Sequence, residues 1–297
     1  MFTFGPEPLS ELLPLLRTAL EDAGEVTFSV PDPDVGEGLY AGEFGPAGRH
    51  RSLAVWADVA EVLGARLRTP RVLQGGRVQL TLQRLPPILR EGDYGPASEF
   101  GRVDKLEDPW FLVGFVEALQ RAKLSAGARI LSVGVGAGRE LDALALAYPG
   151  AVFEVVGIDL DESALNLARQ RHPHWHFEVG DVNALAPELG RFDLIVALSV
   201  LQSRGVNLDV ALRGLMKHHL NESGSLILGF PNSRYAGGEV RYGARMLNYR
   251  DPDLSLLLSD VALVRRHLHK HGFKVYVTGK YEVLVTGVPV KRPTIHP

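Results

Sequence analysis

The chain has 297 residues, 45% hydrophobic and 23% charged, with a formal net charge of −3 and no cysteine. These values exclude a mainly disordered, collagen-like or coiled-coil chain, and the missing thiols exclude disulfide scaffolds, thiolate zinc sites and cysteine nucleophiles. The start shows no leader peptide, and no apolar run approaches the ~18 residues of a membrane helix, so we expect a soluble, cytoplasmic protein.

The N-terminal third is rich in proline and glycine and predicts a small α+β unit. The expected elements are helices over residues 9–20 and 51–67 and strands over residues 25–30 and 78–85. A length near 300 residues favours about two domains, and the polar stretch 86–108 supplies a boundary. We therefore expect a first domain over residues 1–95, serving as a lid or in substrate recognition, and a second over residues 96–297.

A helix should follow the polar stretch. Pro109 suits its first position and Asp108 its cap. The helical spacing predicts a buried stripe along one face, made of Trp110, Val113, Val116 and Leu119.

From residue 128 the pattern alternates between apolar strands and amphipathic helices. The expected strands are 128–135, 152–160, 175–181, 192–200 and 224–230, and the helices that we place include 139–148, 161–172 and 254–271. Near-continuous apolar strands alternating with helices predict a parallel sheet covered on both faces. Residues 273–279 and 281–287 are two strands separated by one residue, so they form an antiparallel hairpin.

A glycine-rich loop joins the first of these strands to its helix. Gly134, Gly136 and Gly138 allow close approach of backbone to a ligand, and the helix start offers unpaired N–H groups. Asp159, at the end of the next strand, is placed to accept the two hydroxyls of a ribose. The spacing G-x-G-x-G with Arg139 in the sixth position differs from the G-x-G-x-x-G of dinucleotide-binding proteins. The loop favours a nucleoside with a small charged tail.

Segment 128–289 resembles the class I S-adenosylmethionine-dependent methyltransferases, through ILSVGVGAG, GIDLD, EVGDVNAL, RFDLIVALSVL and ESGSLIL in this order. The resemblance implies a Rossmann-like, seven-stranded, mostly parallel sheet with a terminal antiparallel hairpin, and S-adenosyl-L-methionine as cofactor. It implies cofactor contacts at Ser132, Gly134, Val135, Gly136, Gly138, Asp159, Leu160, Asp181, Val182, Leu198 and Ser199. Ser132 departs from the pattern, because the family often has an acid there.

The methyl acceptor should bind beyond the carboxyl ends of the fourth and fifth strands. Weak candidates for catalytic residues there are Gln202, Asn232 and Tyr235. Residues 234–250 are rich in arginine and tyrosine, which suits recognition of anions and flat groups. Candidate substrate-binding residues are Arg204, Arg234, Arg241, Tyr242 and Tyr249.

Several functions stay open at this point. Residues 234–297 hold eleven Lys and Arg against five Asp and Glu, which indicates an anionic partner or simply a solvated surface. We favour a small polar or anionic acceptor over RNA. The sequence is also compatible with a non-catalytic S-adenosylmethionine-binding module and with a NAD-dependent oxidoreductase, although the loop spacing disfavours the oxidoreductase. The alternating histidines at 172–176 and 267–271 lack carboxylate partners at ligand spacing, so we expect no metal site.

Overall fold

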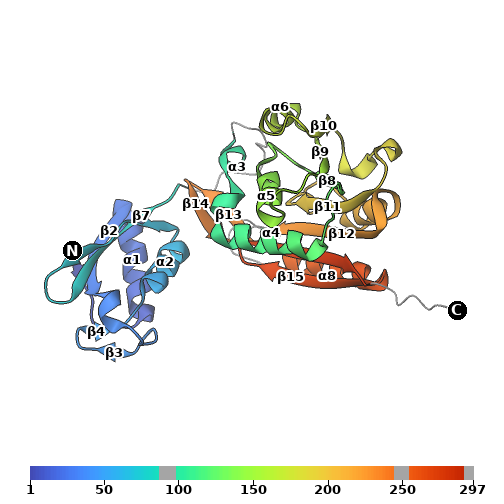
Figure 1. Cartoon of the computed structure of the whole chain (residues 1–297). Helices are drawn as coiled ribbons and strands as arrows, with labels where there is room; N and C mark the ends of the chain where they lie inside the picture. The colour runs from blue at the N-terminus through green and yellow to red at the C-terminus, as the bar shows by residue number, and fades with distance from the viewer. Residues whose placement is uncertain (87–97, 244–253, 291–297) are drawn as a thin grey trace. The chain divides into compact units, whose positions relative to one another are not determined.

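The computed structural model describes residues 1–86, 98–243 and 254–290, and its contacts divide the chain into two compact units (Figure 1). Unit 1 consists of Met1–Arg90 and Tyr235–Arg241, and unit 2 consists of Glu91–Arg234 and Tyr242–Pro297. In the described ranges, no helix is long and apolar enough to cross a membrane.

Unit 1 is a small sheet packed with two helices. Its elements are β1 (Phe2–Thr3), α1 (Leu9–Ala23), β2 (Glu25–Pro31), η1 (Pro33–Gly36), β3 (Phe44–Gly45), β4 (Gly48–Arg49), α2 (Leu53–Val62), β5 (Ala65–Leu67), β6 (Arg71–Leu73) and β7 (Arg77–Arg84). Leu12, Leu16 and Leu20 recur every four residues along α1 and are buried in the core of the unit with Phe28 and Trp56.

The prediction of one helix over residues 51–67 is wrong in its last part. The helix ends at Val62, and Gly64 takes a φ of +66°, a left-handed conformation that suits glycine and turns the chain. Residues 65–67 then pair with β7 as strand β5. The hydrophobic spacing of this segment continues past the point where glycine ends the helix.

Unit 2 contains a seven-stranded sheet in the order β10-β9-β8-β11-β12-β16-β15. Its elements are α3 (Glu99–Arg102), η2 (Lys105–Glu107), α4 (Pro109–Ala122), β8 (Arg129–Val133), η3 (Arg139–Asp142), α5 (Ala143–Ala147), β9 (Glu154–Asp159), α6 (Glu162–Arg171), β10 (His176–Val179), η4 (Val182–Ala184), η5 (Pro187–Leu189), β11 (Phe192–Leu198), α7 (Leu208–Gly214), η6 (Leu215–His219), β12 (Leu220–Pro231), α8 (Ser255–Lys270), β15 (Phe273–Gly279) and β16 (Glu282–Pro289). A further hairpin, β13 (Ser233–Ala236) and β14 (Glu239–Tyr242), follows β12 and contributes its tip to unit 1.

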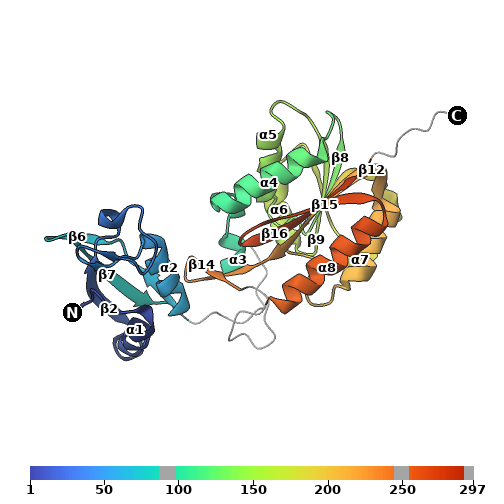
Figure 2. The same cartoon turned by 90° about the horizontal axis from the view of Figure 1, so that it is seen from below.

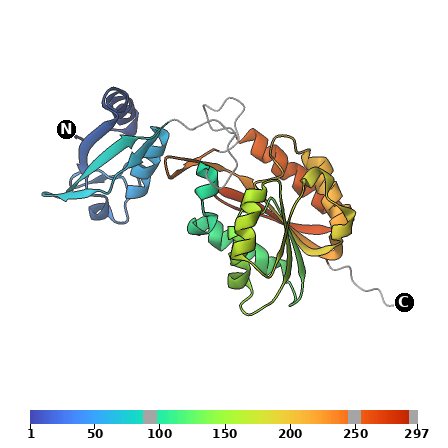
Figure 3. The same cartoon turned by 90° about the horizontal axis from the view of Figure 1, so that it is seen from above.

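The first five strands of this sheet in chain order pair in parallel, and β16 pairs antiparallel with both β12 and β15. This arrangement confirms the predicted mostly parallel sheet with a terminal hairpin. Within the hairpin, the later strand β16 lies between β12 and the earlier strand β15. Helices cover both faces (Figure 2 and Figure 3): α4, α5 and α6 contribute to one apolar core, and α7 and α8 to the other.

Helix α4 starts at Pro109 with Asp108 as its cap, as predicted. Of the predicted stripe, Leu119 is buried and Val116 packs against the core, but Trp110 and Val113 are exposed. The carboxylate of Asp108 accepts a hydrogen bond of 2.9 Å from the Trp110 N–H. Trp110 is 61% exposed, whereas Phe111 and Phe115 are buried and their rings stack. Two phenylalanines four residues apart form the larger apolar surface, so the helix turns that face inward.

Candidate functional site

The glycine-rich loop follows β8 at the carboxyl edge of the sheet. The N–H groups of Gly134 and Val135 both donate to the carbonyl of Ile158, at 2.7 and 3.0 Å, so the loop is anchored to β9. Gly134, Gly136 and Gly138 have φ of +65°, +52° and +72°. Three left-handed residues so close together explain the need for glycine at these positions. The predicted helix over residues 139–148 begins here as the 3₁₀ turn η3 and becomes α-helical at Ala143.

Asp159 ends β9 and holds the loop from the other side. One of its carboxylate oxygens accepts the N–H of Gly136 at 2.8 Å, and the other accepts the N–H of Asp161 at 3.0 Å. The side chain is half-buried. A carboxylate oxygen has two lone pairs, so each oxygen retains acceptor capacity for a further donor. The structure therefore brings the predicted loop and the predicted acid into direct contact.

The three glycines differ in what surrounds them. A Cβ at Gly134 would lie 2.0 Å from the Val200 side chain, so this glycine is required by packing. A Cβ at Gly138 would lie 3.2 Å from His172. At Gly136 nothing lies within 4 Å of that position. Gly136 thus presents bare backbone to open space beside the Asp159 carboxylate, which is the environment that a closely bound ligand needs.

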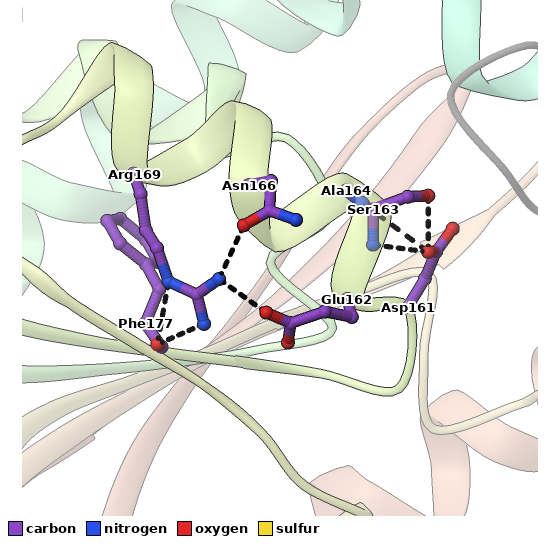
Figure 4. A network of polar contacts seen from close by, with 7 residues as sticks. All are labelled: Asp161, Glu162, Ser163, Ala164, Asn166, Arg169 and Phe177. Carbon is purple, nitrogen blue, oxygen red and sulfur yellow. Dashed lines mark hydrogen bonds and ion pairs between the residues drawn. The ribbon is translucent and has the colours of Figure 1, made fainter.

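Helix α6 keeps the end of β9 in place through a polar network (Figure 4). Asp161 accepts the N–H of Ser163 at 2.8 Å and so caps the helix. Further along the helix, Arg169 donates to the carbonyl of Phe177 in β10 at 2.8 Å and pairs with Glu162. Figure 4 shows both contacts on the same helix. The Arg169 contact attaches α6 to β10. The cap residue Asp161 is two residues after Asp159 and donates its N–H to the Asp159 carboxylate.

Three further predicted residues follow the ends of β9 and β10. Asp181 is exposed and caps η4, with one oxygen accepting the backbone and side-chain N–H groups of Asn183, each at 2.9 Å. This is the turn-capping role that such a residue has without any ligand. Val182 is half-buried and Leu160 is 71% exposed. An apolar side chain exposed beside Asp159 is available for contact with a flat ring.

The comparisons with known proteins meet at this part of the chain. Residues 130–224 match a family model described as a methyltransferase domain. This part of the chain is thus similar in sequence to methyltransferase domains. The family uses S-adenosylmethionine, and the open backbone at Gly136 beside an acceptor-rich carboxylate fits a nucleoside cofactor.

Curated relatives match less than the whole chain. A trans-aconitate 2-methyltransferase of Paracidovorax citrulli is 32% identical over 155 residues, which are 51% of this chain and 56% of that protein. One of Variovorax paradoxus is 40% identical over 86 residues, which are 29% and 32% of the two chains. The chain thus spans about half the length of these relatives or less. A methyltransferase of Aquifex aeolicus superposes with a TM-score of 0.48 at 18% identity, over 67% of this chain and 100% of that one.

Unit 2 also contains a buried polar cluster that the sequence pattern did not indicate as a whole. Ser199, directly after β11, has a φ of +57° and donates to the Glu282 carboxylate at 2.8 and 3.0 Å. The ammonium of Lys105 lies 2.8 Å from the Ser199 hydroxyl and 3.2 Å from Glu282. Leu198 ends β11 beside it and is half-buried. Of these four residues, the sequence pointed only to Leu198 and Ser199, because nothing in a linear pattern links positions 105, 199 and 282.

Arg139 makes contacts that the sequence did not predict. Its guanidinium donates to the carbonyls of Gly101 and Val103, both at 2.8 Å. The segment before α4 is therefore attached to the residue that follows the glycine loop. Ser132, the position at which the family often has an acid, is buried within β8.

The predicted acceptor residues are divided between the two units. Gln202 lies just beyond β11, and its Oε1 is buried without a hydrogen-bond partner among the described residues. Asn232 donates from its amide to the carbonyl of Lys280 at 3.0 Å, so it supports the β15–β16 turn. Tyr235 and Arg241 belong to unit 1. The others are placed as follows: Arg204 exposed after β11, Arg234 and Tyr242 in β13 and β14, and Tyr249 outside the described residues.

Histidines form parts of the scaffold. His172 stacks on Trp175 with ring centroids 4.4 Å apart, and its Nε2 lies 2.8 Å from the carbonyl of Gly138. His267 and His271 pack together near the end of α8. Within the part of the chain that the structure describes, no three metal-ligating side chains are grouped as a metal site would require.

Proposed function

We propose that the chain transfers a methyl group from S-adenosylmethionine to a small acceptor that carries carboxylates. The observation that carries the proposal is the contact between Gly136 and Asp159, within a domain that matches a methyltransferase model. The sulfonium of the cofactor supplies an activated methyl group. The protein then has to bind, orient and shield the two reactants, because alignment supplies much of the rate.

In this proposal the chain holds the cofactor along the carboxyl edge of β8, β9 and β11. Asp159 accepts the ribose hydroxyls with its remaining lone pairs, and the exposed Leu160 side chain packs on the adenine. Asp181 and the backbone of Val182 bind the adenine edge. The backbone at Gly136 faces the ligand, while Gly134 and Gly138 keep the loop close to its neighbours. Ser132, Val135, Leu198 and Ser199 complete the candidate set around the remainder of the cofactor.

An anionic acceptor is supported by chemistry and by the relatives. The matched relatives bear the name trans-aconitate 2-methyltransferase. A carboxylate is already deprotonated at neutral pH, so its methylation requires no general base. At the turn between β15 and β16, the Lys280 ammonium lies 5.7 Å from the Trp110 ring centroid and 4.6 Å from that of Tyr281. The rings hold the ammonium in place, and its charge can pair with a carboxylate of the acceptor.

The role proposed for the N-terminal domain is selection of the acceptor. Tyr235 and Arg241, predicted from sequence as acceptor residues, belong to unit 1 by their contacts. The chain leaves unit 2 after β12 to form this hairpin tip, where Arg66 pairs with Glu239 at 2.5 Å and donates to the carbonyl of Gly237 at 2.6 Å. Recognition residues on a loop of this kind are common in enzymes with a rigid scaffold.

The cytoplasm is the proposed compartment.

Binding of the cofactor is tested by thermal shift with S-adenosylmethionine, S-adenosylhomocysteine and NAD, each at about 100 times a micromolar Kd, where one-site binding adds about 2.7 kcal/mol. We expect stabilisation by the first two only. Asp159→Asn should abolish the shift. Asp193→Asn is the matched control: Asp193 also accepts a backbone N–H, that of Arg129 at 2.9 Å, but at the amino end of β11. Stabilisation by NAD alone would contradict the proposal.

The acceptor is tested by incubating the protein with S-adenosylmethionine and trans-aconitate. Mass spectrometry then shows whether trans-aconitate has gained one methyl group as a methyl ester. A panel of di- and tricarboxylates follows if trans-aconitate itself is not methylated. RNA is the alternative acceptor. RNA binding through six or more phosphates would weaken about a thousandfold between 50 and 200 mM salt, whereas a small carboxylate should lose far less. A steep salt dependence with methylated RNA as product would replace the small acceptor in the proposal.

A further inference from the structure

Residues 101–105, which precede α4, are tied down at both ends by cationic side chains. At one end, the Arg139 guanidinium donates to the carbonyls of Gly101 and Val103 at 2.8 Å. Arg139 directly follows the glycine loop, so this end lies beside the carboxyl end of β8. Gly101 lies in the last turn of α3 and Val103 directly after it, and carbonyls at a helix end need such donors to be satisfied.

At the other end, Lys105 is buried in contact with two strand ends. Its ammonium donates to the Ser199 hydroxyl at 2.8 Å and to the Glu282 carboxylate at 3.2 Å. Ser199 donates in turn to Glu282. The side chains of Lys105 and Glu282 are 8% and 6% exposed. Ser199 follows β11 and Glu282 begins β16, so this end reaches past the crevice between β8 and β11.

Strand β12 lies between β11 and β16, and a glycine lets Glu282 reach across it. Glu282 stands opposite Pro231 in the register, and a Cβ at Gly229 would lie 2.4 Å from its Oε1. The Ser199 N–H donates to the Gly229 carbonyl at 2.9 Å. Only a residue without a side chain leaves room for the carboxylate at this point. The pairing of Glu282 with Ser199 and Lys105 therefore depends on Gly229.

The path of the segment follows from these contacts. It runs from beside β8 to beyond β11, and these are the neighbouring strands at which the chain order of the sheet reverses. Open α/β sheets bind their ligands outside the carboxyl ends of the strands at such a point. A buried ion pair is an inefficient source of stability, since desolvation of the two charges offsets their attraction. What the pair does supply is a fixed direction and position.

We propose that residues 101–105 form a strap across the cofactor crevice, and that Arg139 and Glu282 are positioning residues that hold its two ends. This inference rests on the proposed function, because the crevice is that of the S-adenosylmethionine site. The strap restricts escape of the cofactor and fixes Lys105 and Ser199 at the side from which the acceptor approaches. Neither Arg139 nor Glu282 needs to touch a reactant for this purpose.

The strap itself is tested by hydrogen exchange of the full chain without any ligand. Arg139→Gln and Glu282→Gln should each raise the exchange rate of the amides of residues 102–106 by tenfold or more. Arg129→Gln is the matched control, because Arg129 likewise bonds a carbonyl, that of Arg191 at 2.8 Å, and an acid, Glu154, at the amino edge of the sheet. Unchanged exchange in both strap variants would overturn the proposal.

Its consequence for the cofactor is tested by calorimetric titration with S-adenosylhomocysteine. Glu282→Gln and Lys105→Met each remove one charge of the buried ion pair and keep the other. The double variant carries neither charge and therefore separates positioning from stability. We expect the double variant to keep the thermal midpoint of the wild type within a few degrees and to bind S-adenosylhomocysteine about tenfold more weakly. The KM for S-adenosylmethionine should rise with little change in kcat, and Lys105→Arg should recover part of the affinity.

The outcomes separate the two proposals. If the double variant binds S-adenosylhomocysteine as tightly as Arg129→Gln, the cluster is structural only and the strap is overturned. If the wild-type chain does not bind S-adenosylhomocysteine at all, the proposed function fails. The exchange experiment, which contains no ligand, then still decides whether the strap exists.

Discussion

Gly136 and Gly150 share a left-handed backbone and open space at the Cβ position, but they lie in different parts of the fold. Their φ values are +52° and +77°, and a Cβ at either would meet nothing within 4 Å. A side chain at either position costs roughly 1–2 kcal/mol through the left-handed backbone alone. Gly136 lies in the loop bonded to Asp159, whereas Gly150 ends the turn after α5. In the proposed function, the cofactor fills the open space at Gly136.

Gly136→Ala should therefore reduce the affinity for S-adenosylhomocysteine by tenfold or more, because the methyl group enters the space of the ligand. Both variants should lower the thermal midpoint by a similar amount, because both place a side chain on left-handed backbone. Gly150→Ala should leave the affinity for S-adenosylhomocysteine unchanged. Calorimetric titration of both variants, with their melting curves, provides the comparison. Equal affinities in the two variants would show that the cofactor does not approach Gly136.

At the residue scale, local sequence is informative where one segment carries the geometry. The glycine spacing and the acid at the end of the next strand were sufficient to single out the loop and Asp159, which the structure then brings into contact. The cluster of Lys105, Ser199 and Glu282 was not predictable, because its three members meet only through the order of β11, β12 and β16. The signal that existed was Gly229, a glycine inside an apolar strand, which often marks a close approach.

At the end of helix α8, burial and the helix dipole act in opposite directions on the pKa of His267. His267 lies in its last turn, where the helix dipole favours a charged imidazole. Burial nevertheless lowers the pKa of His267 below its usual value, and the neighbouring His271 lowers it further. Asp209 acts in the opposite direction, while Arg213 and Lys270 add to the lowering. Desolvation of the ring is the largest of these effects, so the folded protein disfavours the charged form.

This effect makes stability depend on pH. The unfolded chain binds a proton at His267 near pH 6.5, and the folded chain binds it only at lower pH, so the free energy of unfolding should fall as the pH drops below about 6.5. His267→Gln should flatten that part of the curve. Urea unfolding of both proteins between pH 5 and 8 measures it, with His174→Gln at an exposed histidine as control. An unchanged slope in His267→Gln would contradict the assignment.

Element types followed from periodicity more reliably than the face or the end of each element. The spacing of α4 suits both a face with Trp110 and a face with Phe111 and Phe115, and only the sheet beneath the helix decides between them. The helix that ends at Val62 could be extended on paper to residue 67, because apolar spacing continues. Pairing of residues 65–67 with β7 outweighs helix propensity there. Tertiary context therefore sets what local pattern leaves open.

The whole molecule contains separate apolar cores for its two units. The core of unit 1 includes Phe28 and Trp56, and every buried residue in it lies between positions 4 and 82. The two cores of unit 2 take all their buried residues from positions 111–285. Each unit thus buries its own apolar surface, which is the main requirement for folding alone. The candidate cofactor residues, from Ser132 to Ser199, all belong to unit 2.

A chain that starts at residue 98 should consequently fold and bind S-adenosylhomocysteine with an affinity within about threefold of the full chain. The Arg66–Glu239 ion pair is lost in this chain, and the hairpin tip at residues 235–241 loses the rest of unit 1. If unit 1 selects the acceptor, methylation of the acceptor should be lost while cofactor binding remains. Circular dichroism melting establishes folding first. A folded short chain without affinity for S-adenosylhomocysteine would show that unit 1 contributes to the cofactor site, and retained methylation would remove its proposed role in acceptor selection.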